Sequence, residues 1–591
     1  MRRLAWLAAL VVAFGPNSHS VVSPQSPQPG EELQITDNEV GHYGGSLVVA
    51  QPTEPKTLNP VTAVDVRSRE VIGRMMADLI HINRDSQKTE PSLAKSWTAS
   101  LDGRVFTLRL RRGLRFSDGQ PFNADDVVFS FQVYLDEKIH SPQRDLLIVG
   151  GKPIGVQKID SYTVRFTLPQ PYAAAERLFD SLAMMPRHLL EKAYREDRFT
   201  QLWNINTSPV EIAGMGPFRL KHDVPGQRIV LERNPYFWKV DTKKNRLPYL
   251  DELVFLVVGN EDAQVIRFQA GDTDIMSRVN AENYALLSRD AQNRGYELFD
   301  LGPSLEYNFF LFNLNDLKGA SASKIGPKSA WFADLRFRQA VSFAIDREAI
   351  VKLVYAGRAV PLWGNVSPSN KLWMDQSLPH PARSLDHARA LLKSADFSWR
   401  SDGRLLDRQG RAVEFSVVSS SSNNQRTKMA TIIQDDLSKL GMDVHVVPLE
   451  FRALLDRVFQ TFDYEAAVMG LGGGDADPNP EMNVWLSSGS THLWHLGETK
   501  PATDWEAQID QLMQKQMIEL NYDRRKRLYD QVQEIIASKV PFVFLATPNI
   551  LAGAKKNLAN FKPAILEPTT LWNVEELYFR QGSGASAGAK R

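Results

Sequence analysis

A glycine-rich segment at residues 468–478, Val-Met-Gly-Leu-Gly-Gly-Gly-Asp-Ala-Asp-Pro, carries the residue types best suited to hold a ligand. Gly470, Gly472, Gly473 and Gly474 leave main-chain amides and carbonyls uncovered, so the backbone of a ligand can approach closely. No Gly-Lys-Ser or Gly-Lys-Thr ending follows, which excludes a nucleotide P-loop of the usual kind. These residue types leave two interpretations open, a binding loop and a mobile turn.

Two carboxylates, Asp475 and Asp477, raise the alternative of an exported hydrolase. Glycoside hydrolysis needs a fixed separation between two carboxyl groups, and a glycine-rich loop cannot supply one. The chain has no Gly-x-Ser-x-Gly nucleophile elbow and no His-Glu-x-x-His zinc helix. We therefore predict no catalytic residues and no enzyme activity, and expect Asp477 to brace the turn before Pro478.

His492 and His495 are spaced as neighbours on one helical turn, beside Trp494. A metal site needs further ligands, and the sequence places no Asp or Glu as a third one. The chain contains no cysteine, which also removes thiolate ligands, thiol nucleophiles and disulfides. We predict neither a metal site nor a cofactor.

Strands and helices alternate along the chain without a short repeat, which indicates an α/β architecture. Residues 47–50 predict a first buried strand. Residues 423–440 predict a long helix that ends at Gly441, and residues 443–447 predict the strand that follows it. The same helix-then-strand order recurs at 522–545, so a second α/β lobe is expected.

A half-buried strand is predicted at residues 105–110, where Phe106, Leu108 and Leu110 share one face. Asn123 then has the position of a helix N-cap, and the acidic residues that follow it suit the positive end of a helix dipole.

Length and composition indicate a soluble, multidomain globular protein. A chain of 591 residues exceeds what one core can organise, and 43% hydrophobic and 24% charged residues are typical of globular proteins. The formal net charge of +1 gives no overall attraction to nucleic acid or to anionic membranes. No nucleic-acid partner is expected, and we expect a monomer.

Residues 1–20 predict a cleaved export signal. Arg2 and Arg3 precede an apolar run at 4–14, and small residues occur up to Ser20, where cleavage is expected. Such a run is too short to span about 30 Å of hydrocarbon. Without a cysteine to carry a lipid anchor, the exported chain is expected in the periplasm. Residues 21–43 predict a flexible leader, and residues 581–591 a disordered tail.

Many ordered motifs resemble the family 5 extracellular solute-binding proteins, the periplasmic class that feeds oligopeptide and dipeptide ABC importers. The likeness covers nearly all of the chain after the export signal, and the long leader and glycine-rich segment look most like its YejA-type branch. The motifs are Leu58-Asn59-Pro60, Pro91-Ser-Leu-Ala94, Ser96-Trp97, Asp102-Gly103, the block from Phe116 to Phe131, Gly216-Pro-Phe-Arg219, the block from Leu231 to Trp238, Leu247-Pro-Tyr-Leu-Asp-Glu252, Ala270-Gly-Asp-Thr-Asp274, the block from Asp334 to Ala340, Ala344-Ile-Asp-Arg347 and Arg524-Arg-Lys-Arg-Leu-Tyr529.

This resemblance implies the α/β fold of a type II periplasmic binding protein, with two hinged lobes and an extra α/β domain (cluster C). A solute is held between the lobes and delivered to ABC permease subunits. The implied units are lobe I at 44–83, 204–301 and 548–580, the extra domain at 84–203, and lobe II at 302–547, with crossings near Gly302 and Thr547.

The resemblance also implies where the ligand binds and which cargo is expected. Peptide-binding members carry an Asp in the glycine-rich loop for the ligand's α-amino group, but Gly474 stands at that position and Asp475 is displaced by one residue. We therefore expect a peptide that is blocked, modified or longer. An oligosaccharide, an opine or a metal chelate are alternative cargoes. The expected ligand-binding residues are Leu58, Asn59, Tyr307, Asn308, Trp363, Gly472, Gly473, Gly474 and Asp475.

Overall fold

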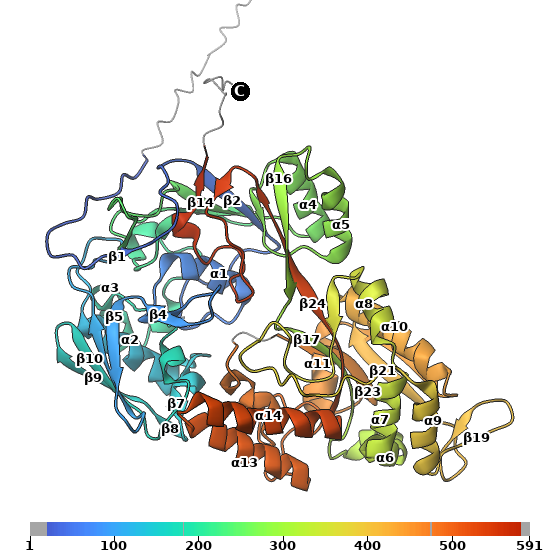
Figure 1. The fold of residues 1–591 in the computed structure, drawn as a ribbon. Helices are drawn as coiled ribbons and strands as arrows, with labels where there is room; N and C mark the ends of the chain where they lie inside the picture. The colour runs from blue at the N-terminus through green and yellow to red at the C-terminus, as the bar shows by residue number, and fades with distance from the viewer. Residues whose placement is uncertain (1–20, 181, 473–475, 581–591) are drawn as a thin grey trace, which may run out of the picture.

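The computed structural model describes residues 21–180, 182–472 and 476–580. The expected export signal, Gly473, Gly474, Asp475 and the expected tail lie outside the described residues. The described chain folds into two α/β halves, which we call lobe I and lobe II, and a third unit that lies against lobe I (Figure 1). No described helix combines the length and the apolar character needed to cross a lipid bilayer.

One large mixed sheet runs through both lobes. In lobe I its strands are, in spatial order, β11 (Phe218–Val224), β12 (Arg228–Arg233), β14 (Glu252–Val257), β2 (Ser46–Gln51) and β15 (Ile275–Met276). In lobe II they are β17 (Tyr307–Phe312), β23 (Ala466–Leu471), β21 (Glu414–Ser420) and β22 (Asp443–Leu449). The sheet is continuous because β24 (Phe542–Lys555) belongs to both halves.

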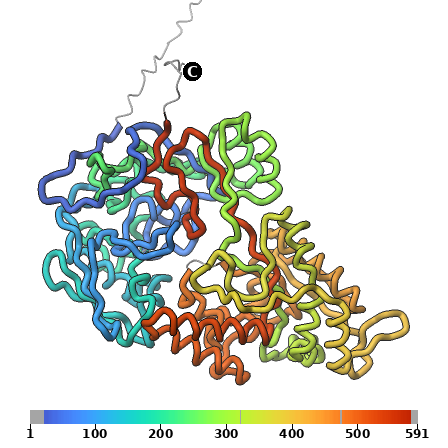
Figure 2. The backbone as a smooth tube through the Cα atoms, viewed as in Figure 1, coloured from blue at the N-terminus to red at the C-terminus, as the bar shows by residue number. Residues whose placement is uncertain are grey.

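Strand β24 changes its partner where it leaves lobe II. Its first part pairs with β17, with Asn308 opposite Ala546, and its second part pairs with β16 (Tyr296–Pro303), with Pro303 opposite Asn549. The register is irregular at both ends of this change. The lobes are thus joined by two adjacent chain segments, one green and one red in Figure 2. Such short crossings are where hinged domains absorb their motion.

Strand β17 shows why lobe II has helices on both faces of its sheet. All six of its residues are buried. Tyr307, Phe309 and Leu311 pack into a core with α13 (Asp504–Ile518) and α14 (Tyr522–Lys539). Phe310 and Phe312 pack on the opposite side against other helices. Those are α7 (Leu335–Ala344), α8 (Arg347–Tyr355), α9 (Leu385–Ser394) and α10 (Asn424–Ser438).

The third unit is built on a four-stranded antiparallel sheet, β5 (Ala94–Ala99), β6 (Val105–Leu110), β10 (Thr163–Thr167) and β9 (Gly155–Asp160). The predicted face of β6 is confirmed, since Phe106, Leu108 and Leu110 are buried. Asn123 caps α2 (Ala124–Leu135) as predicted, in a capping box with Asp126. This unit shares one hydrophobic core with lobe I.

The remaining main elements complete the lobes. Lobe I contains α1 (Val66–Met75), α4 (Glu261–Ala270) and α5 (Ala281–Asp290), with α3 (Arg187–Arg195) in the third unit. Lobe II contains α6 (Gly319–Ala333), α11 (Phe451–Asp456), α12 (Met482–Trp485) and β18 (Ala359–Pro361). Short strand pairs are β1 (Gln34–Ile35) with β13 (Lys239–Val240), and β3 (Ile80–Ile82) with β4 (Thr89–Pro91).

The segment at 21–43 differs from the flexible leader that its composition predicts. Strand β1 pairs with β13, and Glu31 forms a buried ion pair of 2.5 Å with Arg246. The main-chain oxygens of Val22 and Gln25 accept hydrogen bonds from Arg233 and Arg246. The reason is that this segment docks through charges and main-chain bonds, which leave no apolar periodicity in the sequence.

Candidate functional site

The described part of the glycine-rich segment lies at the end of β23, beside β17. Tyr307 pairs with Leu471 and Asn308 with Gly470, so two of the predicted site regions are brought together. Gly472 is exposed, and a Cβ added there would meet no atom within 4 Å. The space beside Gly472 would therefore let an incoming chain approach this strand end closely.

Gly470 gives room to Arg426, which projects from the first turn of α10. A Cβ on Gly470 would lie 2.2 Å from the Arg426 guanidinium, so a glycine at this position leaves the room that the arginine side chain occupies. Arg426 donates a hydrogen bond of 2.9 Å to Asn308 Oδ1 and one of 3.1 Å to Glu306. The Arg426 side chain remains 20% exposed, so it can also reach a solute.

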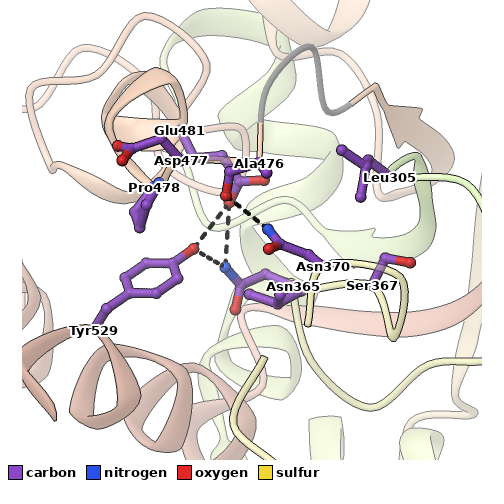
Figure 3. Close-up of a pocket in the computed structure, with 10 residues that line it drawn as sticks. Leu305, Asn365, Ser367, Asn370, Ala476, Asp477, Pro478, Glu481 and Tyr529 are labelled. Atoms are coloured by element: carbon purple, nitrogen blue, oxygen red, sulfur yellow. Dashed lines mark hydrogen bonds between the residues drawn. The ribbon is translucent and has the colours of Figure 1, made fainter. Parts of the chain in front are cut away.

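A small polar pocket of about 20 Å³ lies on lobe II next to this loop (Figure 3). Asn365 donates to Glu481 and to Tyr529 over 3.2 and 2.9 Å, and Asn370 donates to the main chain of Ala476 over 2.7 Å. The Oδ1 atoms of both asparagines are buried without a hydrogen-bond partner. Burial also raises the pKa of Glu481. The pocket thus has polar atoms available for a water or a ligand group.

Asp477 supports this pocket from behind. Its carboxylate forms two hydrogen bonds of 2.7 Å to Arg525 of α14, and both side chains are 6% exposed. It also accepts from the amide of Asn479. This agrees with a bracing role for Asp477, because the carboxylate is fully engaged inside the protein.

Lobe I contributes a larger cavity of about 540 Å³, between α1, the third unit and residues 567–575. Four ion pairs hold its charged walls: Arg67 with Glu70, Arg84 with Asp180, Lys239 with Glu575, and Arg278 with Glu567. The aromatic side chains in the lining are Phe237, Trp238 and Trp572. Paired charges and aromatic rings suit a solute that carries both polar and apolar groups.

Arg74 of α1 stands apart in this lining. It is 7% exposed, it donates to the main-chain oxygen of Leu571, and its Nε has no hydrogen-bond partner. Burial lowers the pKa of Arg74 to about 10, so the side chain stays charged at neutral pH. A buried guanidinium with an unused N–H is a candidate anchor for a carboxylate or carbonyl of the solute.

Leu305, in the crossing between the lobes, connects the two hollows. It lines the pocket of lobe II and packs with Ile82 and Leu566. Those residues adjoin His81 and Glu567, which line the cavity of lobe I. The cavity and the pocket therefore lie on either side of the crossing.

The other predicted site residues have internal partners. Leu58 is 1% exposed in the core of lobe I, and the Asn59 amide donates to the main chain of Phe199 and Leu202. Tyr307 is 1% exposed, and burial raises its pKa well above the ordinary value. Trp363 stacks on His380 at 4.5 Å. These side chains position the walls and do not line either hollow.

Sequence reasoning missed Arg74, Arg426, Asn365 and Asn370. Asn423 caps α10, and Arg426 lies in the first turn of this helix. A charged residue in that first turn was the one signal for Arg426 that the sequence offered. Nothing in the sequence distinguishes Arg74 from other arginines of an amphipathic helix.

The fold and the two-sided cleft define a class, the type II periplasmic binding proteins. The model of the "Bacterial extracellular solute-binding proteins, family 5 Middle" matches residues 88–492, and the chain belongs to this family. The family resemblance predicted from the motifs is confirmed, and the family consists of solute-binding proteins of ABC importers rather than enzymes.

Individual relatives align over almost the whole chain. A "Probable ABC transporter-binding protein" of Deinococcus radiodurans is 29% identical over 539 residues, which cover 87% of this chain and 89% of the relative. The oligopeptide-binding protein AppA of Bacillus subtilis is 25% identical over 90% of this chain and 91% of its own. The structure of AppA in complex with a nonapeptide superposes with a TM-score of 0.69 at 25% identity, covering 91% of this chain and 100% of AppA.

Proposed function

We propose that this protein captures a peptide or a modified peptidic compound in the periplasm and delivers it to ABC permease subunits. The observation that carries the proposal is the exposed Gly472 at the end of β23, next to the polar pocket of lobe II, together with the cavity of about 540 Å³ in lobe I. An extended peptide can add its own main-chain hydrogen bonds to such a strand end. The nonapeptide complex of AppA supports the same class of cargo.

The cargo that we propose does not need a free α-amino group. Gly474 replaces the carboxylate that the family resemblance leads one to expect, and burying an unpaired ammonium costs several kcal/mol. Two cationic side chains are the anchors that we propose, Arg74 on lobe I and Arg426 on lobe II. They suit the carboxylate or the carbonyls of a peptidic ligand.

Native mass spectrometry of protein released from the periplasm by osmotic shock tests the compartment and the cargo together. We expect a retained peptidic mass and a monomeric protein. A retained oligosaccharide or metal chelate would redirect the proposal to another solute, and absence of the protein from the shock fluid would contradict the periplasmic location.

Calorimetry then tests how the ligand is held. Free-amine and N-acetylated forms of one retained peptide should bind within about threefold of each other, since Gly474 stands where the family resemblance places the carboxylate for the amine. Arg426→Met and Arg74→Met should each weaken binding by about 10- to 100-fold, the range for a hydrogen bond to a charged group. Arg524→Met, at an exposed position on α14, is the matched control. A strong demand for the free amine would contradict the proposed mode.

A further inference from the structure

A second polar cluster lies inside lobe II, outside the cleft walls described above. His492, Glu498 and Glu506 each direct one ligand atom into it, and the three atoms lie within 4.8 Å of one another. The side chains are almost fully buried, with exposures of 0% for His492, 3% for Glu498 and 2% for Glu506. His492 and Glu498 come from the loop after α12, and Glu506 from the first turn of α13.

The tautomer of His492 follows from its surroundings. Its Nδ1 lies 3.0 Å from the main-chain oxygen of Val484, and because a carbonyl only accepts, Nδ1 carries the hydrogen. In the neutral ring, Nε2 then presents a lone pair to the cluster. Nε2 has no hydrogen-bond partner and lies 3.6 Å from Glu506 Oε1, which exceeds hydrogen-bonding distance.

Both carboxylates are held in place from outside the cluster. Glu506 accepts hydrogen bonds from Trp494 Nε1 at 2.9 Å and from Thr503 Oγ1 at 2.7 Å. Glu498 accepts from the amide of Ala502 through Oε2, and its Oε1 makes an ion-pair contact of 2.5 Å with His495 Nδ1. A carbonyl on the histidine and hydrogen bonds on the carboxylates are typical of outer partners that orient metal ligands.

We propose that His492, Glu498 and Glu506 form a buried site for a divalent transition metal, with Zn²⁺ as the best fit. Bonds of about 2.1 Å in a tetrahedral site place neighbouring ligand atoms about 3.4 Å apart, close to the 3.6 Å between His492 and Glu506. The charge of the cation balances the two carboxylates, with His495 beside them. This site ties the loop to α13 and has no part in the proposed capture of solute.

Two other groups of similar composition differ in a decisive way. In the cluster of Asp78, His81 and Asp180, the histidine already bonds to Asp78 at 3.0 Å and Arg84 pairs with Asp180. The cluster of Glu414, Asp443 and His445 is exposed on the surface of β21 and β22. Neither combines burial with an imidazole nitrogen that lacks a hydrogen-bond partner.

Metal analysis of the full chain, purified without a polyhistidine tag, tests the site. After treatment with EDTA, we expect ZnCl₂ to bind at one ion per chain and to raise the melting temperature by about 5 °C at a hundredfold excess over the dissociation constant. CoCl₂ should give the visible absorption of a tetrahedral site. No bound zinc and no shift in melting temperature would overturn the proposal.

Glu498→Gln keeps the shape of the side chain and should weaken zinc binding at least about 100-fold, while the metal-free melting temperature and circular dichroism remain those of a folded protein. His492→Gln is the second variant, with the same expectation. His445→Gln removes the histidine of the exposed cluster and should leave the zinc affinity unchanged. Equal affinity in all three variants would show binding elsewhere and would overturn the assignment.

Discussion

Arg524 and Arg525 are adjacent on α14, yet their surroundings differ. Arg525 is buried and holds Asp477 through two hydrogen bonds, whereas Arg524 pairs with Glu519 at the surface with 61% of its side chain exposed. Removing one partner of a buried pair leaves the other charge without compensation, while surface pairs contribute little. The position of an ion pair decides its energetic weight.

Arg525→Met should lower the free energy of unfolding by about 3–5 kcal/mol, because Asp477 would remain buried and unpaired. Arg524→Met should leave the urea midpoint nearly unchanged. Urea unfolding followed by fluorescence measures both variants. Equal effects of the two substitutions would contradict the assigned role of the Asp477–Arg525 pair.

Glu481 gives stability a pH dependence. Burial raises its pKa above the ordinary 4.5 in the folded protein, so the folded chain binds this proton more tightly than the unfolded chain. The stability that protonated Glu481 contributes is fully present below pH 4.5 and is lost as the pH rises through the raised pKa. Glu481→Gln should therefore gain stability over the wild type as pH increases from about 4.5 to 8. Thermal unfolding across this range measures it, and parallel curves would refute it.

At the scale of elements, Gly216 lies where two backbone segments approach each other closely. A Cβ on Gly216 would lie 2.4 Å from the carbonyl carbon of Met75 and 2.6 Å from the oxygen of Arg74, at the end of α1. The amide of Gly216 donates to Met75 over 2.8 Å. Gly216 thus allows its backbone to pack against the end of α1, the helix that carries Arg74.

Gly216→Ala should lower the free energy of unfolding by about 1–3 kcal/mol, because main-chain atoms must shift. Gly73→Ala, in α1 with no atom within 4 Å of the added Cβ, should instead raise it by about 0.5–1 kcal/mol. Thermal unfolding of the two variants measures the contrast, and a destabilised Gly73→Ala would contradict it.

Elements with local signals were predicted well. Helix α14 spans the predicted 522–539, and α10 (Asn424–Ser438) lies within the predicted 423–440, with Asn423 as its cap and Gly441 after it at a φ of 84°. Helical spacing, capping residues and glycine after a helix are readable because they act within a few residues. The lobe boundaries at 301–302 and 547–548 stay a prediction.

The binding site was less readable because its contacts are distant in sequence. Arg426 meets Asn308 and Gly470 only after three elements have packed, and Leu58 and Asn59 were expected at the ligand although their partners are internal. The glutamates around His492 were likewise invisible, since a loop and a helix bring them together. Tertiary packing determines such contacts, and the hydrophobic periodicity of the sequence does not reveal them.

At the scale of the whole molecule, the segment at 21–43 ties lobe I to the third unit. Glu31 pairs with Arg246 of lobe I, and Glu32 pairs with Lys95 of β5. Removing residues 21–36 should lower the melting temperature by at least about 5 °C, since Arg246 would lose its buried partner. Glu31→Gln should reproduce part of the loss and Glu32→Gln little of it. An unchanged melting temperature after truncation would favour the flexible leader that the composition predicts.

The third unit also touches lobe II. The amide of Ala173 donates to the oxygen of Met517 over 2.8 Å, and Leu520 lies against Gly103. Leu520→Glu should weaken this contact and favour opening, with weaker ligand binding and a larger radius of gyration in X-ray scattering. Leu101→Glu, at a fully exposed position, is the control. Identical scattering from both variants would show that the contact does not affect closure.

Strand β24 has a consequence for how the protein is made. The lobe I half of the large sheet needs β2 and residues 553–554 beside β15 and residues 549–555 beside β16, and the lobe II half needs residues 542–546 beside β17. Neither sheet is complete until nearly the whole chain is present. Contacts so distant in sequence slow folding. Completion of both halves of the large sheet therefore depends on residues 542–555, close to the end of the described chain.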